Sequence, residues 1–181
     1  MEWSEIYTPK PHIQDDWFNS INDSITLMKV QDTISTLPNN KASGPSSITY
    51  EDIKHLDAHT KQFLVEFFNL ILTHHTYPSE WNKALLFPIP KPKDWNCQIN
   101  NTRPIVLLET TQKLLVKILT TRLNIILSMH PILEHNNQAG LLGRSTIEPI
   151  IHIKHIIEHF NLTNDKNYRL VFKTSLKLTI V

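Results

Sequence analysis

Residues 84–108 read A-L-L-F-P-I-P-K-P-K-D-W-N-C-Q-I-N-N-T-R-P-I-V-L-L, and the rest of the chain is arranged around them. Two short apolar runs, Leu85 to Ile89 and Ile105 to Leu108, predict the strands of a β-hairpin because a polar loop separates them. Pro88 and Pro104 lie in or beside these runs, and proline within a sheet is confined to edge positions. The sequence therefore predicts a hairpin with sheet-edge positions at both prolines.

The loop between the two predicted strands is basic. It carries Lys91, Lys93 and Asp94, and Arg103 lies at its far end. Lysine offers a phosphate group a point charge, and arginine offers a planar fork that matches two phosphate oxygens, so this loop suits a polyphosphate ligand. A solvated surface hairpin is the alternative, and charge alone favours that alternative.

Composition limits the class of protein. The 181 residues are 40% hydrophobic, enough for one domain or for part of a larger protein. The net charge of +1 means that any nucleic-acid-binding surface must be local. One cysteine, Cys97, excludes a disulfide framework and a cysteine-based zinc site. With neither a signal-peptide layout nor a long apolar run, we expect a soluble intracellular protein of the cytoplasm or nucleus, without a membrane partner.

Apolar periodicity and capping signals predict a largely helical chain on both sides of the hairpin. Helices are expected over 21–37, 49–56, 57–75, 109–129 and 146–160, and a last strand over 168–172. The apolar face of the 57–75 helix should be buried, as should those of the two later helices. The expected core residues are Phe63, Leu64, Phe67, Phe68, Ile71 and Leu72, then Leu114, Leu115, Ile118, Leu119, Leu123, Ile126 and Met129, then Ile150, Ile153, Ile156, Ile157 and Phe160.

Residues 40–45, N-K-A-S-G-P, and residues 81–91, W-N-K-A-L-L-F-P-I-P-K, resemble two motifs of the reverse transcriptases of non-LTR, LINE-like retrotransposons. Asn40 to Pro45, N-K-A-S-G-P, resembles the loop N-K-A-x-G-P-D-G of that family. Trp81 to Lys91, W-N-K-A-L-L-F-P-I-P-K, resembles its W-x-x-A-x-x-x-P-I-P-K. Two departures stand out, since Ser46 and Ser47 occupy the places of the aspartate and glycine of the loop.

Two further stretches continue the resemblance in the same order. Arg103 to Leu108, R-P-I-V-L-L, resembles R-P-I-S-L-L, and Lys113 and Arg122 follow as in the helix after that motif. Residues 138–146, Q-A-G-L-L-G-R-S-T, resemble Q-A-G-F-x-x-G-R-S-T with leucine in place of phenylalanine. The four stretches together span about residues 39–160, most of the chain.

The resemblance implies that this is the fingers region of an RNA-directed DNA polymerase, ahead of the palm. Lys91 and Arg103 match positions whose side chains meet the triphosphate of the incoming deoxynucleotide. Lys41, Lys93 and Arg144 are candidates for contacts with the nucleic-acid backbone, which are electrostatic and insensitive to sequence. For Arg122, a surface ion pair on its helix is the favoured interpretation.

The acids that would hold the metal ions of such a polymerase are missing from the expected place. The family uses two Mg²⁺ ions held by aspartates, the first in a string like D-L-x-K-A-Y-D after the fourth stretch and the others downstream. Residues 171–181 read V-F-K-T-S-L-K-L-T-I-V, and Asp165 is the last carboxylate. We therefore expect no catalytic residue, metal ligand or cofactor in this chain itself.

A one-base frameshift near Val171 accounts for the missing acids. Suitable codons for L-Q-D-L-S-K-A-Y-D-R, read with the first base omitted, encode F-K-T-S-L-K-L-T-I-V, which is the sequence of residues 172–181. We predict that the locus or its transcript encodes D-L-S-K-A-Y-D in a shifted frame. Sequencing both would test this hypothesis.

The predicted fold class is α+β, in three parts. Residues 1–38 form an N-terminal helical or linker segment, residues 39–165 the reverse transcriptase fingers region, and residues 166–181 the frameshifted start of a palm strand. Without a palm, we expect exposed apolar surface, marginal stability and aggregation through the edges at residues 170–172 and 176–181.

The functional expectation is a fragment of a retrotransposon RNA-directed DNA polymerase, a nucleotidyltransferase, that is inactive alone. Its expected partners are an RNA template, an RNA–DNA hybrid and a deoxynucleoside triphosphate, and the oligomeric state is left open. The alternative is a non-enzymatic helical module that binds nucleic acid or another protein. His152, His155 and His159 share one helix stripe, but histidines alone rarely complete a metal shell, so a solvated surface is favoured over a metal site.

Overall fold

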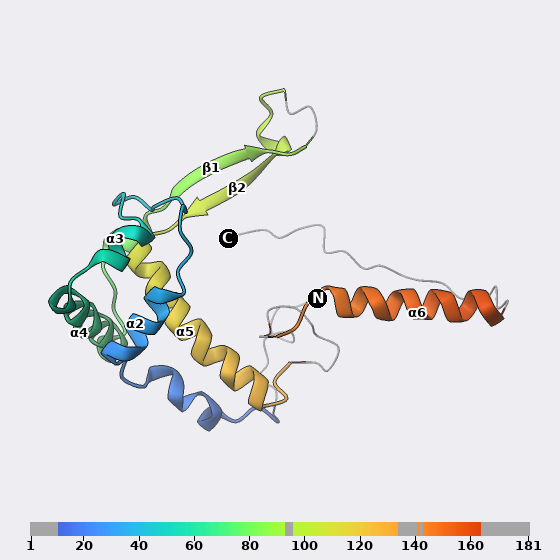
Figure 1. Cartoon of the computed structure of the whole chain (residues 1–181), viewed down its shortest axis with the longest axis horizontal. Coiled ribbons are helices and arrows are strands. Elements are labelled where there is room, and N and C mark those ends of the chain that lie inside the picture. The colour runs from blue at the N-terminus through green and yellow to red at the C-terminus, as the bar shows by residue number, and fades with distance from the viewer. Residues whose placement is uncertain (1–10, 93–95, 134–140, 142, 164–181) are drawn as a thin grey trace. The chain divides into compact units, whose positions relative to one another are not determined.

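A computed structural model describes residues 11–92, 96–133, 141 and 143–163. The chain divides into two compact units, Met1–Ile132 and Leu133–Val181. The first unit holds the 3₁₀ helices η1 (Asp15–Asn22), η2 (Ser79–Asn82) and η3 (Ile99–Asn101), the helices α2 (Leu27–Ser35), α3 (Tyr50–His55), α4 (Ala58–His74) and α5 (Thr110–Met129), and the strands β1 (Leu85–Pro90) and β2 (Thr102–Leu107) (Figure 1). The second unit holds α6 (Ile147–Thr163). The α+β class predicted from the sequence is confirmed.

Side-chain caps explain where the helices begin. The Asp52 N–H donates to the Thr49 hydroxyl at 3.2 Å, while the Thr49 N–H donates to the Asp52 carboxylate at 2.8 Å, which makes a capping box at the start of α3. Asp57 caps α4 by accepting the Thr60 N–H at 2.6 Å. α4 ends where His75 adopts a left-handed backbone conformation, with φ of 51°. Both predicted helix starts are therefore confirmed.

The core of the first unit lies between α2, α3, α4 and α5. Burying the apolar faces of these helices is the main favourable term in forming the unit. The segment before residue 38 belongs to this core, because α2 packs against both α4 and α5. The division of the chain at residues 38 and 165 otherwise stays a prediction. The buried cluster consists of Ile25, Val30, Ile34, Leu37, Ile53, Leu64, Val65, Phe68, Leu114, Leu115 and Ile118.

Three residues predicted to be buried are exposed instead. Phe63 is 60% exposed, because the buried stripe of α4 centres on Leu64 and Phe68. On α5, Leu123 is 36% exposed and Met129 is 72% exposed. The second half of α5 packs against η1, which has no buried residue and so provides no apolar layer to cover these side chains.

Arg122 joins α5 to the segment that links η1 and α2. Its guanidinium donates to the backbone carbonyls of Ile21 at 2.7 Å, Asp23 at 2.6 Å and Ser24 at 3.3 Å. The predicted surface ion pair is therefore wrong, because these carbonyls satisfy the fork of donors. Near the end of α5, the rings of Trp17 and His130 stack with centroids 4.3 Å apart.

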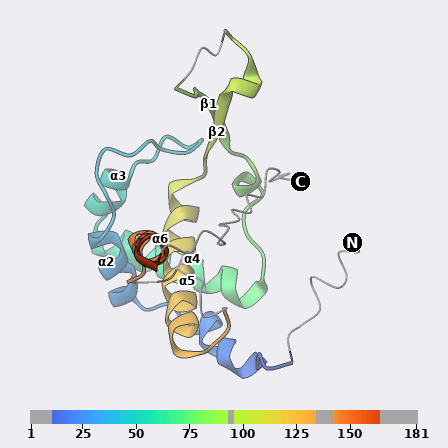
Figure 2. The same cartoon turned by 90° about the vertical axis from the view of Figure 1, so that its right-hand side faces the viewer.

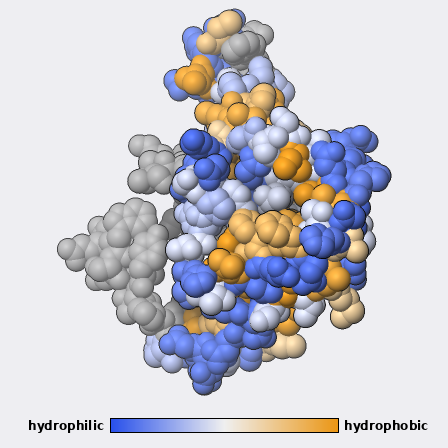
Figure 3. Space-filling view, turned by 90° about the vertical axis from the view of Figure 1, so that its left-hand side faces the viewer, coloured by the Kyte–Doolittle hydropathy of each residue, from blue (hydrophilic) through white to orange (hydrophobic). Residues whose placement is uncertain are grey.

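The hairpin stands away from the helices of its unit, as both Figure 1 and Figure 2 show. β1 and β2 pair antiparallel, with Leu85 opposite Leu107 and Pro88 opposite Pro104, which confirms the predicted hairpin. Both faces of the ladder are apolar and open to solvent, and Figure 3 shows hydrophobic side chains on this projection. The exposed apolar side chains are Leu85, Leu86, Phe87, Ile89, Ile105 and Val106.

The prolines occupy the non-hydrogen-bonded pairs of the ladder. Just beyond β1, the Lys91 N–H donates to the Asn101 carbonyl at 2.9 Å, so Lys91 and Asn101 form a hydrogen-bonded pair. Hydrogen-bonded and non-hydrogen-bonded pairs then alternate along the ladder from that pair. Pro88, Pro90 and Pro104 then fall where the backbone nitrogen points outward. Each proline removes a donor that an added strand would need, so the edges of the hairpin resist strand addition.

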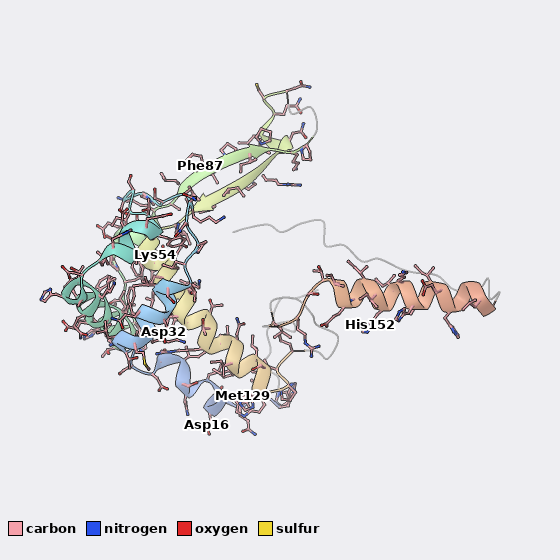
Figure 4. All side chains as sticks on the ribbon, in the orientation of Figure 1. Asp16, Asp32, Lys54, Phe87, Met129 and His152 are labelled. Atoms are coloured by element: carbon pink, nitrogen blue, oxygen red, sulfur yellow. The ribbon has the colours of Figure 1, made fainter. Side chains whose placement is uncertain are left out.

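The second unit contributes one described helix, α6. The expected burial is wrong for Ile150, which is 61% exposed, and for Ile156, which is 44% exposed. Ile153 and Ile157 are half-buried, and the side chain of Phe160 lies outside the described residues. His152, His155 and His159 are exposed on this helix, and Figure 4 labels His152 there. The predicted strand at 168–172 and the aggregation edges at 170–172 and 176–181 lie outside the described residues, as do residues 138–140 and 142 of the Q-A-G-L-L-G-R-S-T stretch.

Candidate functional site

The register of the hairpin places its two candidate phosphate-binding cations on one face. Arg103 lies opposite Ile89, and Lys91 lies two residues beyond Ile89. The Lys91 backbone bond to Asn101 continues the ladder by one step, and residues two apart in a strand project to the same face. Lys91 and Arg103 therefore project from the same face of the hairpin, towards its loop end.

A hydrogen bond anchors the Lys91 side chain, whereas the Arg103 side chain is exposed to solvent. The Lys91 ammonium donates to the Asn100 carbonyl at 2.9 Å, and Lys91 is half-buried. An ammonium carries three donors, so this contact leaves two for a ligand. Arg103 is exposed on β2. Beneath them, Thr102 closes the loop by donating its hydroxyl to the Ile99 carbonyl at 2.7 Å.

The two strands of the hairpin carry charge of one sign. Neither β1 nor β2 contains an acidic residue, so the two strands offer no carboxylate to neutralise Arg103 or Lys91. The apolar side chains around the cations provide a flat surface of low polarity, where Phe87 lies on β1 (Figure 4). Such a face can hold an anionic group at one end and an apolar ring beside it.

The loop that carries Lys41 is fixed against the start of α5, close to the base of the hairpin. We call the contact between residues 39–48 and residues 108–113 the loop–α5 junction. A Cβ on Gly44 would come within 2.3 Å of the Leu108 carbonyl oxygen, which leaves room only for glycine. The Ser46 N–H donates to the Glu109 carboxylate at 2.7 Å, and the Ser46 hydroxyl donates to its second oxygen.

Three more contacts close the loop–α5 junction. The Thr110 hydroxyl donates to the Ile48 carbonyl, and the Lys113 ammonium donates to the Ala42 carbonyl at 3.3 Å. The same ammonium lies 5.5 Å from the centre of the Tyr50 ring. Desolvation lowers the pKa of Lys113, against the opposing effect of the Glu109 charge.

The Ser46–Glu109 contact explains how this chain accommodates serine where the family motif has aspartate. Where the resembling loop has aspartate, this chain has Ser46, and the buried carboxylate of Glu109, the residue before α5, reaches the same place. An aspartate at position 46 would put two carboxylates together, which is unfavourable in a buried setting. No pattern in the sequence marked Glu109 as a site residue.

Ser47 shows why the second departure costs energy. Its φ is 65°, in the left-handed region that glycine adopts freely and that other L-residues resist. Asn40, at the other end of the loop, has φ of 56°, and asparagine tolerates this conformation better. The Asn40 N–H donates to the Glu51 carboxylate at 2.6 Å, and this bond lowers the pKa of Glu51.

The remaining predicted site residues lie elsewhere. Lys41 is exposed on the loop of the junction. Lys93 falls outside the described residues. Arg144 belongs to the second unit, where it forms an exposed ion pair with Glu148 at 3.5 Å. The structure therefore brings together Lys91 and Arg103, and it leaves the grouping of the other three residues as a prediction.

The described residues do not fit the two Mg²⁺ ions that the family resemblance implies. Across 11–92, 96–133 and the described part of 141–163, no three His, Cys, Asp or Glu side chains gather closely enough to hold a metal ion. Within the same residues, no helix has the length and apolar character needed to cross a membrane.

Comparison with curated proteins of known annotation found two relatives among mobile-element polymerases. The chain is 29% identical over 145 residues to the probable RNA-directed DNA polymerase from transposon BS of Drosophila melanogaster, a match that covers 80% of the chain. It is 29% identical over 100 residues, 55% of the chain, to the RNA-directed DNA polymerase from mobile element jockey of the same organism. No protein-family model matches the chain.

The chain is thus similar to the RNA-directed DNA polymerases of mobile elements. The resemblance predicted from the four motifs is confirmed at this level. The matched regions make up 16% of the transposon BS protein and 11% of the jockey protein, so the chain spans only a small part of the length of these relatives. The hairpin and the loop–α5 junction are parts of this reverse-transcriptase-like chain.

Proposed function

We propose that this chain supplies the fingers part of an RNA-directed DNA polymerase, and that its hairpin binds the triphosphate of an incoming deoxynucleotide. One observation carries the proposal, namely that Lys91 and Arg103 share a face of the ladder on which neither strand has an acid. The relatives named above act as RNA-directed DNA polymerases by their names, which supports the same class of ligand.

The two cations suit different parts of a triphosphate. Arg103 is exposed and can place its planar fork against two oxygens of one phosphate. Lys91 is fixed by the Asn100 carbonyl and offers a point charge with two spare donors. The apolar side chains of the same face, Phe87 among them, can lie against the sugar and base.

Contacts with an RNA template or an RNA–DNA hybrid are proposed for Lys41, Lys93 and Arg144. Lys41 supports this best, because the loop–α5 junction holds its loop in place while Lys41 itself is exposed. Such contacts would be sequence-independent and would weaken as salt increases.

This polypeptide is proposed to bind nucleotide without incorporating it. Residues 166–181 contain no acid, although the family resemblance places the first metal-binding aspartate there, and the described residues hold no set of metal ligands. The alternative is a non-enzymatic module that binds nucleic acid. The described residues lack a cluster of acids that could hold metal ions but keep a basic hairpin. This combination makes the non-enzymatic module the second candidate.

Nucleotide binding by the 181-residue chain tests the proposal directly. The experiment titrates the chain with a fluorescent deoxynucleoside triphosphate and compares it with Lys91→Ala/Arg103→Ala. We expect the double variant to bind at least about tenfold more weakly, since two charge-assisted contacts are lost. Lys83→Ala is the matched control, because it removes an exposed lysine just before β1 and should bind like the parent chain.

Two results would contradict the proposal. Equal binding by the parent chain and the hairpin double variant would remove Lys91 and Arg103 from the site. Incorporation of nucleotide into a primer by the 181-residue chain alone would show that the chain polymerises without the missing aspartates, and would contradict its proposed inactivity.

A further inference from the structure

Three histidines of α6 lie on one side of that helix and are separate from the proposed nucleotide site. His152, His155 and His159 are all exposed, and Figure 4 labels His152 on α6. Imidazole is a preferred ligand of Zn²⁺ and of several other first-row transition metals. The spacing of the three residues decides which of them can share one ion.

His155 and His159 have the spacing of a helical metal-binding pair. Residues four apart on a helix lie about 40° apart around its axis, with Cβ atoms about 5–6 Å apart. Two nitrogens on one tetrahedral Zn²⁺ lie about 3.3 Å apart, and two imidazole rings can reach that separation from those Cβ atoms. Helices that bind zinc through two histidines use the same spacing. His152 lies about 10.5 Å along the axis from His159, too far to bind the same ion.

The charges around the histidine pair do not oppose a metal ion. Two cations belong to the described residues of the second unit, Arg144 and Lys154. Arg144 pairs with Glu148 at 3.5 Å, and Lys154 pairs with Glu158 at 3.7 Å. Each positive charge is therefore balanced by a carboxylate one turn along the chain, and a divalent cation meets no excess of positive charge there.

One copy of α6 offers too few ligands to complete a zinc site. Within the part of the chain that the structure describes, no three His, Cys, Asp or Glu side chains gather closely enough to hold a metal ion. A zinc site takes at least three ligands from protein, and a structural zinc site takes four in a tetrahedral arrangement. A second copy that brings the same two histidines would supply the missing two ligands.

The residues at the two ends of the histidine pair fit a second copy of α6. Ile151 lies about one turn before His155, and Leu162 lies about one turn after His159, on the same side of the helix. Their side chains are 43% and 86% exposed. When two copies of α6 pack antiparallel about a twofold axis through the pair, Ile151 of each copy meets Leu162 of the other, and four imidazoles meet in the centre. The stripe is therefore complementary to itself.

We infer that α6 binds Zn²⁺ between two copies of this chain, with His155 and His159 of each copy as the four ligands. The sequence alone favoured a solvated surface for these histidines. The structure adds the exposed apolar side chains that flank the pair on the same stripe. The inference is independent of the proposed nucleotide binding, because it uses no residue of the hairpin or of the loop–α5 junction.

Zinc-dependent pairing of the full 181-residue chain tests the inference. The molar mass is measured by light scattering with ZnCl₂ and again after EDTA is added, so that any association independent of zinc cancels. We expect the mass in zinc to be twice the mass in EDTA, with one Zn²⁺ bound per two chains. Co²⁺ in place of Zn²⁺ should give the intense visible absorption of a tetrahedral site, whereas the weak absorption of an octahedral ion would contradict the inference.

Matched variants assign the ligands. His155→Gln/His159→Gln should lose the zinc-dependent doubling of mass, and doubling that persists in this variant would place the zinc site elsewhere. His74→Asn/His75→Asn is the control, because it removes two exposed histidines from the first unit and should behave like the parent chain. Asparagine suits the left-handed backbone of His75, whose φ is 51°.

Chemical modification of the parent chain tests the ligands without a substitution. Diethyl pyrocarbonate modifies accessible imidazole rings, and mass spectrometry of peptides reports each histidine separately. Zinc should protect His155 and His159 and leave His74 reactive. Equal modification of His155 and His159 with and without zinc would overturn the inference, whether or not the glutamine variant folds.

The packing of the two helices has its own test. Ile151→Ser/Leu162→Ser removes the apolar contacts and keeps the ligands, so a higher protein concentration should be needed for the mass to double. An unchanged concentration dependence would show that the two helices do not meet along this stripe. One zinc ion per chain with no change in mass would place the ion on a single helix and overturn the inference.

Discussion

The hairpin and the loop–α5 junction show opposite relations between composition and packing. The hairpin is made mostly of apolar residues, yet both of its faces are exposed. The junction is made mostly of small and polar residues, yet Gly44 touches the Leu108 backbone and Glu109 is buried. Apolar content alone therefore does not identify the closely packed part of this chain. Close contact depends on which backbone segments approach each other, and the backbone ladder holds the hairpin together without a core beneath it.

This comparison predicts that one added methyl group at the junction lowers the free energy of unfolding more than two polar substitutions in the hairpin do. Gly44→Ala should destabilise the first unit most, by about 3 kcal/mol, because the new Cβ meets the backbone of Leu108 and cannot be relieved by a side-chain rotation. Urea unfolding followed by circular dichroism measures this. Gly143→Ala is the comparison, since nothing lies within 4 Å of a Cβ there and only the left-handed φ of 76° should cost energy, about 1 kcal/mol. A loss there as large as that of Gly44→Ala would contradict the interpretation.

Removing the buried acid of the junction should have the next largest effect. Glu109→Ala leaves the N–H and hydroxyl of Ser46 without their acceptor, at an expected cost of about 2 kcal/mol. Glu109→Gln keeps one acceptor oxygen and should cost less. In a double-mutant cycle with Ser46→Ala, the two losses should not add, whereas additive losses would show that the Ser46–Glu109 contact contributes little.

A stabilising change is expected at the strained serine. Ser47→Gly should raise the free energy of unfolding by about 0.5 kcal/mol, because glycine adopts a φ of 65° without the steric cost that serine bears, less the extra freedom glycine has when unfolded. The thermal unfolding midpoint should rise. Ser43→Gly in the same loop, where φ is not positive, should lower the midpoint, and an equal rise in both variants would argue against backbone strain at Ser47.

The smallest effect on stability is expected in the hairpin. Leu86→Thr/Val106→Thr changes a cross-strand pair whose side chains are 61% and 53% exposed, and threonine suits a strand. The free energy of unfolding should change by no more than about 0.5 kcal/mol. Light scattering should show less self-association, because exposed apolar area is removed. A large loss of stability would show that this face is packed against something in the folded chain.

Local patterns in the sequence were enough to predict most elements of the first unit. The two apolar runs with their prolines predicted the hairpin, and Thr49 and Asp57 predicted the starts of α3 and α4. These features depend on residues within a few positions of each other, so the sequence displays them directly. The four motifs likewise predicted the relationship to reverse transcriptases that the curated relatives confirm.

What the sequence did not reveal depends on contacts between distant segments. The Ser46–Glu109 bond joins residues 63 positions apart, and the Arg122 contacts with the carbonyls of residues 21–24 join residues about 100 apart. No local pattern encodes such a pairing, so the ion pair expected for Arg122 was wrong and Glu109 was overlooked. The sequence by itself determined most of the helices, the hairpin and the resemblance to mobile-element polymerases. Only the tertiary structure decided which apolar residues are covered, because burial depends on the surface that another segment brings against them.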